Sequence, residues 1–282
     1  MSTRLIINAD DFGFSVAVTD GILRSHRDGV LTSTTLMTTM PDRDRAIDLA
    51  REHPGLGVGI HLSLTQGEPR TGCRRLLSRA HGTFHRSLPR LFWALRSAAA
   101  RREAQEELTA QIGYAFDRGL TPTHVDSHKH VCHLPALHRP LIAACQATGV
   151  RWVRTAREVA IAETGKGSVG YRVLASFARS LASKLPAAGL RTNDWFFGLA
   201  TTGRMDVAVW KALVAGIPPG VGEVMVHPGL IRDLTPELTR LLRHRLVEME
   251  ALCDPELRAI LAAANIQRTH YGTAGEAAGV GL

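Results

Sequence analysis

The sequence predicts an α/β fold in a single domain, a distorted TIM-like (β/α) barrel with about seven parallel strands. Short apolar or β-branched runs alternate with amphipathic helical segments along the chain, which is typical of a parallel sheet. The length of 282 residues is sufficient for one barrel. Acidic and histidine residues follow several predicted strands, and barrel enzymes carry their active sites at the carboxyl ends of the strands.

The strands are predicted from short apolar or β-branched segments bounded by turn residues. The first, residues 5–9, is followed by a helix for which Ser15 is a suitable N-cap and which should end near Gly29. The other predicted strands cover residues 30–39, 56–64, 123–127, 150–154, 195–198, 222–226 and 266–269.

The helices are predicted between these strands. Residues 101–118 form the clearest case, because Leu108, Ile112 and Ala115 fall on one face and Gly119 follows the last turn. The other predicted helices cover residues 42–53, 135–148, 171–185, 205–215, 235–253 and 254–264.

Three segments are predicted to lie outside the regular elements. Residues 65–100, rich in Gly, Pro and Arg, predict an insertion loop with a short helix near 91–100. Residues 156–169 predict a polar loop, and residues 272–282 predict a flexible tail. Since no repeat or long linker divides the chain, residues 1–282 are predicted to be one domain.

The chain is basic, with a net charge of +8, and its arginines are concentrated in residues 70–102 and 172–191. A basic surface favours anionic partners, and an anionic membrane surface is the main candidate. A genome that prefers arginine codons is the plainer explanation. Because no nucleic-acid-binding motif accompanies the charge, no nucleic-acid partner is expected.

The four cysteines, at positions 73, 132, 145 and 253, form no C-x-x-C pair. This pattern excludes a zinc ribbon and a disulfide scaffold, and it indicates thiols in a reducing cytoplasm. No apolar run is long enough for a signal peptide or a membrane span. We therefore expect a cytoplasmic protein, with peripheral contact to the inner membrane as an alternative.

Two short motifs place candidate functional residues after predicted strands. In N-A-D-D-F-G, Asp10 and Asp11 should face different directions, so one can bind a cation while the other accepts a proton. In G-V-G-I-H-L, His61 ends a strand whose glycines leave room for a close neighbour. Taken separately, a helix-capping turn and a hydrogen-bonded core histidine are the plainer explanations.

Two further motifs are rich in histidine. Residues 123–133 hold four histidines, and on a strand His124, Asp126 and His128 share one face. Neutral imidazole is a common metal ligand that a nearby carboxylate can orient, although all four histidines cannot bind one ion. His227 follows the apolar strand at 222–226. A solvated loop and a structural histidine are the alternatives.

Together these motifs indicate metal-assisted hydrolysis. One Asp and two His form a ligand set that leaves positions for water and substrate, a spare Asp supplies a base, and a further His supplies an acid. The sequence has no G-x-S-x-G, H-E-x-x-H or P-loop motif, and no G-x-G-x-x-G directly follows the first predicted strand.

The motifs N-A-D-D-F-G, G-I-H-L and T-H-V-D-S-H-K-H resemble those of the YdjC-like carbohydrate deacetylase family, over residues 4–232. This family includes chitooligosaccharide deacetylases. The resemblance implies a distorted βα barrel with one divalent ion, magnesium, with zinc as the alternative. It implies that Asp11, His61 and His128 bind the metal, that Asp10 is the general base and that His227 is the acid for the departing amine.

A closer resemblance lies in G-L-R-T-N-D-W-F-F-G-L, T-G-R-M and the P-P-G-V-x-E strand before His227. These segments are similar to the HpnK branch, which is associated with hopanoid biosynthesis. The resemblance implies hydrolysis of the acetamide of an N-acetylglucosamine-type sugar on a hopanoid glycolipid, giving a free amine and acetate.

Other functions and further partners stay open at this point. The alternatives are a deacetylase of soluble chitooligosaccharides, another metal hydrolase such as a phosphoesterase, and a non-catalytic membrane-surface or scaffold protein. Asn193, Asp194 and Asp126 are candidates for substrate contacts, while capping of a strand end explains the first two equally well. A homodimer is also compatible with the sequence.

Overall fold

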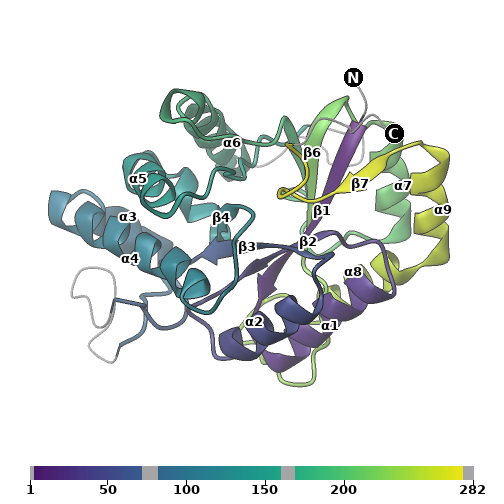
Figure 1. Ribbon diagram of the computed structural model, residues 1–282, viewed down its shortest axis with the longest axis horizontal. Coiled ribbons are helices and arrows are strands. Elements are labelled where there is room, and N and C mark those ends of the chain that lie inside the picture. The colour runs from purple at the N-terminus through teal and green to yellow at the C-terminus, as the bar shows by residue number, and fades with distance from the viewer. Residues whose placement is uncertain (1–2, 72–81, 160–168, 276–282) are drawn as a thin grey trace.

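The computed structural model describes residues 3–71, 82–159 and 169–275 as an α/β fold built on one parallel sheet. The sheet curls into a half-barrel with helices around it (Figure 1). Its strands are β1 (Thr3–Phe12), β2 (Ser33–Leu36), β3 (Gly57–Leu62), β4 (Val125–Ser127), β5 (Trp195–Phe197), β6 (Gly220–Val226) and β7 (Gln267–Thr269). The predicted parallel α/β sheet of about seven strands is confirmed, whereas the complete TIM-like barrel stays a prediction.

The strand order is β4-β3-β2-β1-β6-β5, and β7 pairs with the first half of β1. The central strand β1 is long because its first seven residues pair with β6 and its last residues pair with β2. All the pairs are parallel, so the carboxyl ends of β1, β3, β4 and β6 lie at the same end of the sheet. This common end positions the candidate site.

Residues 150–154 do not form the predicted strand. Single parallel bridges join Val153 to β4 and Trp152 to Arg191. The backbone then leaves the sheet pattern, because the N–H groups of Thr155 and Ala156 donate to side chains, those of Asn193 and His133. The segment therefore connects the two edges of the curled sheet without becoming a regular strand.

The helices lie around the sheet (Figure 1). Helices α3, α4, α5 and α6 gather beside the β3–β4 edge, α7 and α9 lie together near β6 and β7, and α8 packs on α1 next to α2. The bounds are α1 (Val16–Arg27), α2 (Arg43–Glu52), α3 (Leu88–Ala94), α4 (Ala98–Phe116), α5 (His138–Thr148), α6 (Val169–Ala182), α7 (Val207–Ala215), α8 (Arg243–Cys253) and α9 (Pro255–Ala263).

Local sequence signals explain most of these helices. The Ser15 side chain accepts from the backbone N–H of Val18 and caps α1, as predicted. The predicted inward face of α4 is buried at Leu108, Ile112 and Ala115. Helix α8, however, begins at Arg243 instead of residue 235. The carbonyl of Leu238 accepts from two side chains, and so this segment bonds to its surroundings instead of forming a helix.

The insertion and the tail are described only in part. Within residues 65–100, α3 and the start of α4 are regular helices, so the described part is more ordered than a loop. Residues 72–81 of the insertion, 160–168 of the predicted polar loop and 276–282 of the predicted tail lie outside the described residues. Among the described residues, no helix is long and apolar enough to cross a membrane.

Candidate metal centre and active site

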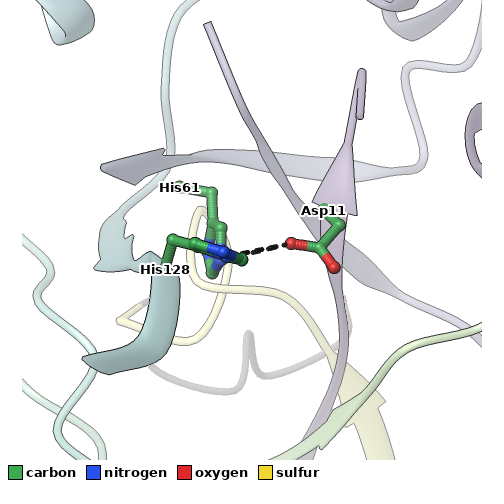
Figure 2. A group of neighbouring side chains, drawn as sticks. All are labelled: Asp11, His61 and His128. Carbon is green, nitrogen blue, oxygen red and sulfur yellow. Dashed lines mark ion pairs between the residues drawn. The ribbon is translucent and has the colours of Figure 1, made fainter. Parts of the chain in front are cut away.

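Asp11, His61 and His128 meet at the carboxyl end of the sheet, although they come from three separate stretches of chain (Figure 2). Each offers one ligand atom, and the three atoms lie within 4.8 Å of one another. The Asp11 Oδ1 atom is 3.6 Å from His61 Nε2 and 3.3 Å from His128 Nδ1. The three predicted ligands are therefore close enough to bind one ion.

Neighbouring residues orient both imidazole rings toward Asp11. His61 donates from Nδ1 to Asp126 at 2.6 Å, which leaves the Nε2 lone pair facing Asp11. His128 donates from Nε2 to the Gln66 side-chain oxygen at 3.0 Å, which leaves Nδ1 facing Asp11. Because a bound proton on one ring nitrogen fixes the free lone pair on the other, this arrangement prepares both rings as ligands.

The two oxygens of the Asp11 carboxylate lie in different environments. Arg245 donates to Oδ2 at 2.5 Å, while Oδ1 is buried and accepts no hydrogen bond from a described residue. A buried carboxylate oxygen without a partner costs free energy unless a cation or a donor binds it. This oxygen faces both free imidazole nitrogens, and so the donor set fits a divalent ion.

A bulge in β1 brings both carboxylates to the same place. The register between β1 and β2 shifts between Ala9 and Phe12, and Asp11 has a φ of 73°. A left-handed conformation is uncommon outside glycine and is often found at functional sites. The sequence prediction that Asp10 and Asp11 face different directions is therefore wrong, because an unbroken strand alternates but this one does not. His61 Nε2 lies 3.9 Å from Asp10 Oδ2.

A second group, Asp10, His61 and Asp126, also meets the spacing for a metal site. Its carboxylates already have partners, since the Arg154 guanidinium donates to both Asp10 oxygens and to Asp126. Arg154 also forms an ion pair with Glu223 at 3.0 Å. A guanidinium in this position supplies the positive charge that an ion would bring, so the Asp11 group is the better candidate.

The electrostatics of the site separate the two aspartates. Burial raises the pKa of Asp10, and Arg154 opposes that effect only in part. Burial also raises the pKa of Asp11, but the neighbouring Arg245 guanidinium opposes it, and that pKa lies well below its usual range. Asp11 is therefore the permanent anion, and Asp10 is the carboxylate with the greater affinity for a proton.

Burial lowers the pKa of both His61 and His128, which keeps the two rings neutral near pH 7. Neutral imidazole is the form that binds a metal. The protonation states of all three residues are thus those of a ligand set.

His227 lies beside Asp10, with Nε2 4.0 Å from Asp10 Oδ2. Burial lowers the pKa of His227 to about 3, so its ring is neutral at pH 7. The Glu248 carboxylate fixes the backbone here by accepting from the N–H of His227 at 2.5 Å, and burial raises the pKa of Glu248 to about 7. His227 is therefore held in place next to Asp10 as a neutral imidazole.

The residues predicted to contact substrate have other partners. The Asn193 amide is buried and bonds to the backbone of Thr155 and Trp195. Asp194 precedes β5 and accepts from the N–H of Val221, near the start of β6 and at the other end of the sheet. Asp126 lies at the site, but its bonds to His61 and Arg154 make it an orienting group.

The remaining histidines of residues 123–133 do not join the ligand set. His124 is fully buried and stacks on Tyr271, with ring centroids 4.1 Å apart. A Cβ atom at Gly59 would lie 2.4 Å from the His124 ring, which confirms the prediction that this strand leaves room for a neighbour. His133 accepts from the N–H of Ala156 and supports the adjoining loop.

Sequence reasoning missed Gln66, Arg154 and Arg245. Arg154 ends a predicted strand, as the acidic candidates do, and this position is a signal that could have drawn attention to it. Gln66 lies two residues after a predicted strand ends, which is a weaker signal of the same kind. Arg245 lies within a helix far along the chain, and no local pattern distinguishes it from the other arginines.

The half-barrel carries one carboxylate and two imidazoles at the carboxyl end of its strands. These features define the class: an α/β protein with a candidate mononuclear metal centre. The chain belongs to the family of YdjC-like proteins, whose model matches residues 4–263.

Named relatives agree with this assignment over nearly the whole chain. A carbohydrate deacetylase of Geobacillus stearothermophilus is 34% identical, over 96% of this chain and 98% of the relative. A carbohydrate deacetylase of Brevibacillus brevis is 33% identical, over 96% of this chain and 100% of the relative. A solved structure from Enterococcus faecalis V583, provisionally described as a cellobiose-phosphate cleavage protein, is 25% identical with a TM-score of 0.77, over 97% of this chain and 99% of that one.

Proposed function

We propose that this chain is a metal-dependent carbohydrate N-deacetylase that hydrolyses the acetamide of an N-acetylglucosamine-type sugar to a free amine and acetate. The relatives named as carbohydrate deacetylases support the reaction class. The observation that carries the proposal is the buried Asp11 Oδ1 atom without a hydrogen-bond partner among the described residues, faced by two free imidazole nitrogens. Asp10 lies beside this set as a second carboxylate.

Asp11, His61 and His128 would hold the ion. When bound, a divalent ion would supply Lewis acidity, polarising the acetyl carbonyl and lowering the pKa of a water. Magnesium, which the family resemblance implies, prefers oxygen ligands and keeps much of its water. Two imidazoles and one carboxylate suit zinc better, so we propose zinc as the preferred ion for this donor set.

Asp10 is the proposed general base. Its pKa is raised by burial, which makes it a better proton acceptor than Asp11, and Arg154 fixes its orientation. A base in this position would take a proton from the attacking water. Arg154 also stays bonded to the neighbouring Asp126.

His227 is the proposed acid for the departing amine. Since its ring is neutral at pH 7, it has to gain a proton during the reaction instead of carrying one beforehand. Asp10, whose Oδ2 is 4.0 Å from His227 Nε2, is the nearest source of the proton removed from water. This sequence of transfers gives one proton to the amine and leaves Asp10 ready for the next cycle.

The sequence supports a more specific proposal for the substrate. The segment at residues 189–199 and the strand before His227 resemble the HpnK branch, which favours a hopanoid glycolipid over a soluble chitooligosaccharide. In that case the enzyme would contact the inner membrane from the cytoplasmic side while it binds its substrate.

Mass spectrometry of N-acetylglucosaminyl lipids and of chitooligosaccharides, each incubated with the zinc-loaded protein, tests this function. We expect the mass change for one acetyl group replaced by hydrogen, together with released acetate. Treatment with a chelator should stop the reaction, and zinc should restore it. Release of phosphate from phosphate esters without release of acetate would instead support a phosphoesterase and contradict the proposal.

A further inference from the structure

An apolar groove lies between α3 and α6, beside the candidate metal centre. Its cavity volume is about 530 Å³, within the usual range for sites that bind a small molecule. Both helices belong to the group beside the β3–β4 edge (Figure 1). The groove therefore lies beside the edge of the sheet to which His61, in β3, and His128, directly after β4, belong.

Large apolar side chains are exposed in this groove. Trp93 is 67% exposed, Phe92 57%, Val173 46% and Leu88 43%. Eight large hydrophobic side chains are exposed among the described residues, and these four line one groove. Single exposed hydrophobic residues need no explanation, but a group of them around one cavity marks a binding surface.

The lining of the groove contains one charged residue among the described residues, Lys129, which lies next to His128 in the sequence. Phe177, Leu174 and Val131 complete an apolar wall. A charged or strongly hydrated ligand would lose more hydration here than the lining replaces, whereas a hydrocarbon group loses none.

The groove adjoins the metal centre along the chain, because two of its lining residues directly follow a proposed metal ligand. Lys129 and His130 line the groove, and they are the two residues after the proposed ligand His128. Consecutive Cα atoms are about 3.8 Å apart, so this wall begins within about 8 Å of the His128 backbone. One substrate molecule can therefore place an acetamido sugar at the metal centre and an attached group in the groove.

We infer that the groove between α3 and α6 binds an uncharged hydrocarbon group linked to the sugar of the substrate. This inference rests on the proposed function for the sugar end of the molecule. Concavity favours this occupant over a membrane surface, because a bilayer contact needs a protruding apolar face and this lining surrounds a cavity. The groove then selects substrates with an apolar aglycone over soluble sugars.

Methyl, butyl and octyl β-glycosides of N-acetylglucosamine test the inference with the zinc-loaded full chain. Each buried methylene is worth roughly a fourfold change in affinity, and the groove is open on one side. We expect kcat/KM for the octyl glycoside to exceed that for the methyl glycoside by roughly tenfold or more, mainly through KM. The variant carrying both Trp93→Ser and Val173→Ser should reduce this ratio to near one.

Phe116→Ser is the matched control, since Phe116 is 37% exposed on α4 and does not line the groove. It should keep the wild-type ratio of octyl to methyl kcat/KM. Equal ratios in the wild type and in the double variant would overturn the inference, as would a loss of the ratio in the control. Loss of binding to phosphatidylcholine vesicles in the double variant, with an unchanged ratio, would assign these side chains to a membrane contact instead.

Calorimetric binding of octyl β-glucoside separates this inference from the proposed function, because that ligand has no acetamide. Binding to the wild type that is lost in the double variant supports the groove even if no acetate is released from any glycoside. If acetate is released but octyl glucoside does not bind and kcat/KM does not depend on chain length, the proposed deacetylase function holds. The inference about the groove is then wrong.

Discussion

Gln66 is predicted to control the affinity of the metal centre although it does not bind the ion. Its side-chain oxygen accepts from His128 Nε2 at 3.0 Å, which directs His128 Nδ1 toward Asp11. In Gln66→Met this acceptor is lost, and the ring is free to rotate or to place its proton on the wrong nitrogen. Loss of such an orienting group lowers metal affinity by about 10- to 100-fold, or about 1.4 to 2.7 kcal/mol.

The fold should tolerate Gln66→Met because the loop is held mainly by its backbone. The Gln66 N–H donates to Ser63 Oγ, and the Gln66 carbonyl accepts from Ser63 and Thr39. The substitution removes one further bond, from the Gln66 amide to the carbonyl of Leu238 at 3.1 Å. We therefore expect a modest loss of about 1 kcal/mol in stability, which is separable from the loss of metal affinity.

Competition titration against a zinc-binding dye measures the affinity directly. Gln111→Met is the matched control, since its buried amide bonds to Ser63 in the same loop but not to a histidine. The control should lose stability and keep its zinc affinity, and Gln66→Glu should recover most of the affinity because a carboxylate still accepts from His128. The reasoning fails if Gln66→Met binds zinc as the wild type does, or if Gln111→Met weakens binding equally.

Three further outcomes follow from the same geometry. Asp10→Asn should lower kcat by about 10²- to 10⁴-fold while zinc affinity changes little, and near-normal acetate release would remove Asp10 as the base. Arg154→Met leaves the carboxylates of Asp10 and Glu223 buried without their cation, so urea unfolding should show a loss of about 3 to 5 kcal/mol; a loss below about 1 kcal/mol would contradict the buried network. Because the pKa of Glu248 is raised from 4.5 to about 7, the folded state holds its proton more tightly, and this stabilisation is lost as the pH rises through that interval. Relative to Glu248→Gln, the wild type should therefore lose about 3 kcal/mol of stability between about pH 4.5 and about pH 8, and an unchanged difference would show that Glu248 does not titrate there.

Local sequence patterns predicted the parallel sheet and most of the helices. Alternating strand and helix signals depend on short-range periodicity, and helix α1 was placed correctly because Ser15 is a strong N-cap. The strand predicted at residues 150–154 did not form because the following residues, Thr155 and Ala156, donate their N–H groups to the side chains of Asn193 and His133. Side-chain competition of this kind depends on tertiary structure and leaves no local pattern.

The sequence motifs predicted which candidate ligands would meet, but not the residues that orient them. Asp11 and His61 lie near the carboxyl ends of β1 and β3, and His128 directly follows β4. Their meeting at one end of a parallel sheet is what the fold class predicts. The β1 bulge was not predictable, since the two adjacent aspartates fit an unbroken strand equally well. Arg154 and Arg245 were missed because each reaches its carboxylate from a distant part of the chain, 144 and 234 residues away.

Crystallography of zinc-soaked crystals, with anomalous data collected at the zinc edge, tests the central claim most directly. The account predicts one anomalous peak about 2.0 to 2.2 Å from Asp11 Oδ1, His61 Nε2 and His128 Nδ1, with Arg154 still bonded to Asp10. A peak held instead by Asp10 and Asp126, or a site without any ion at saturating zinc, would contradict it.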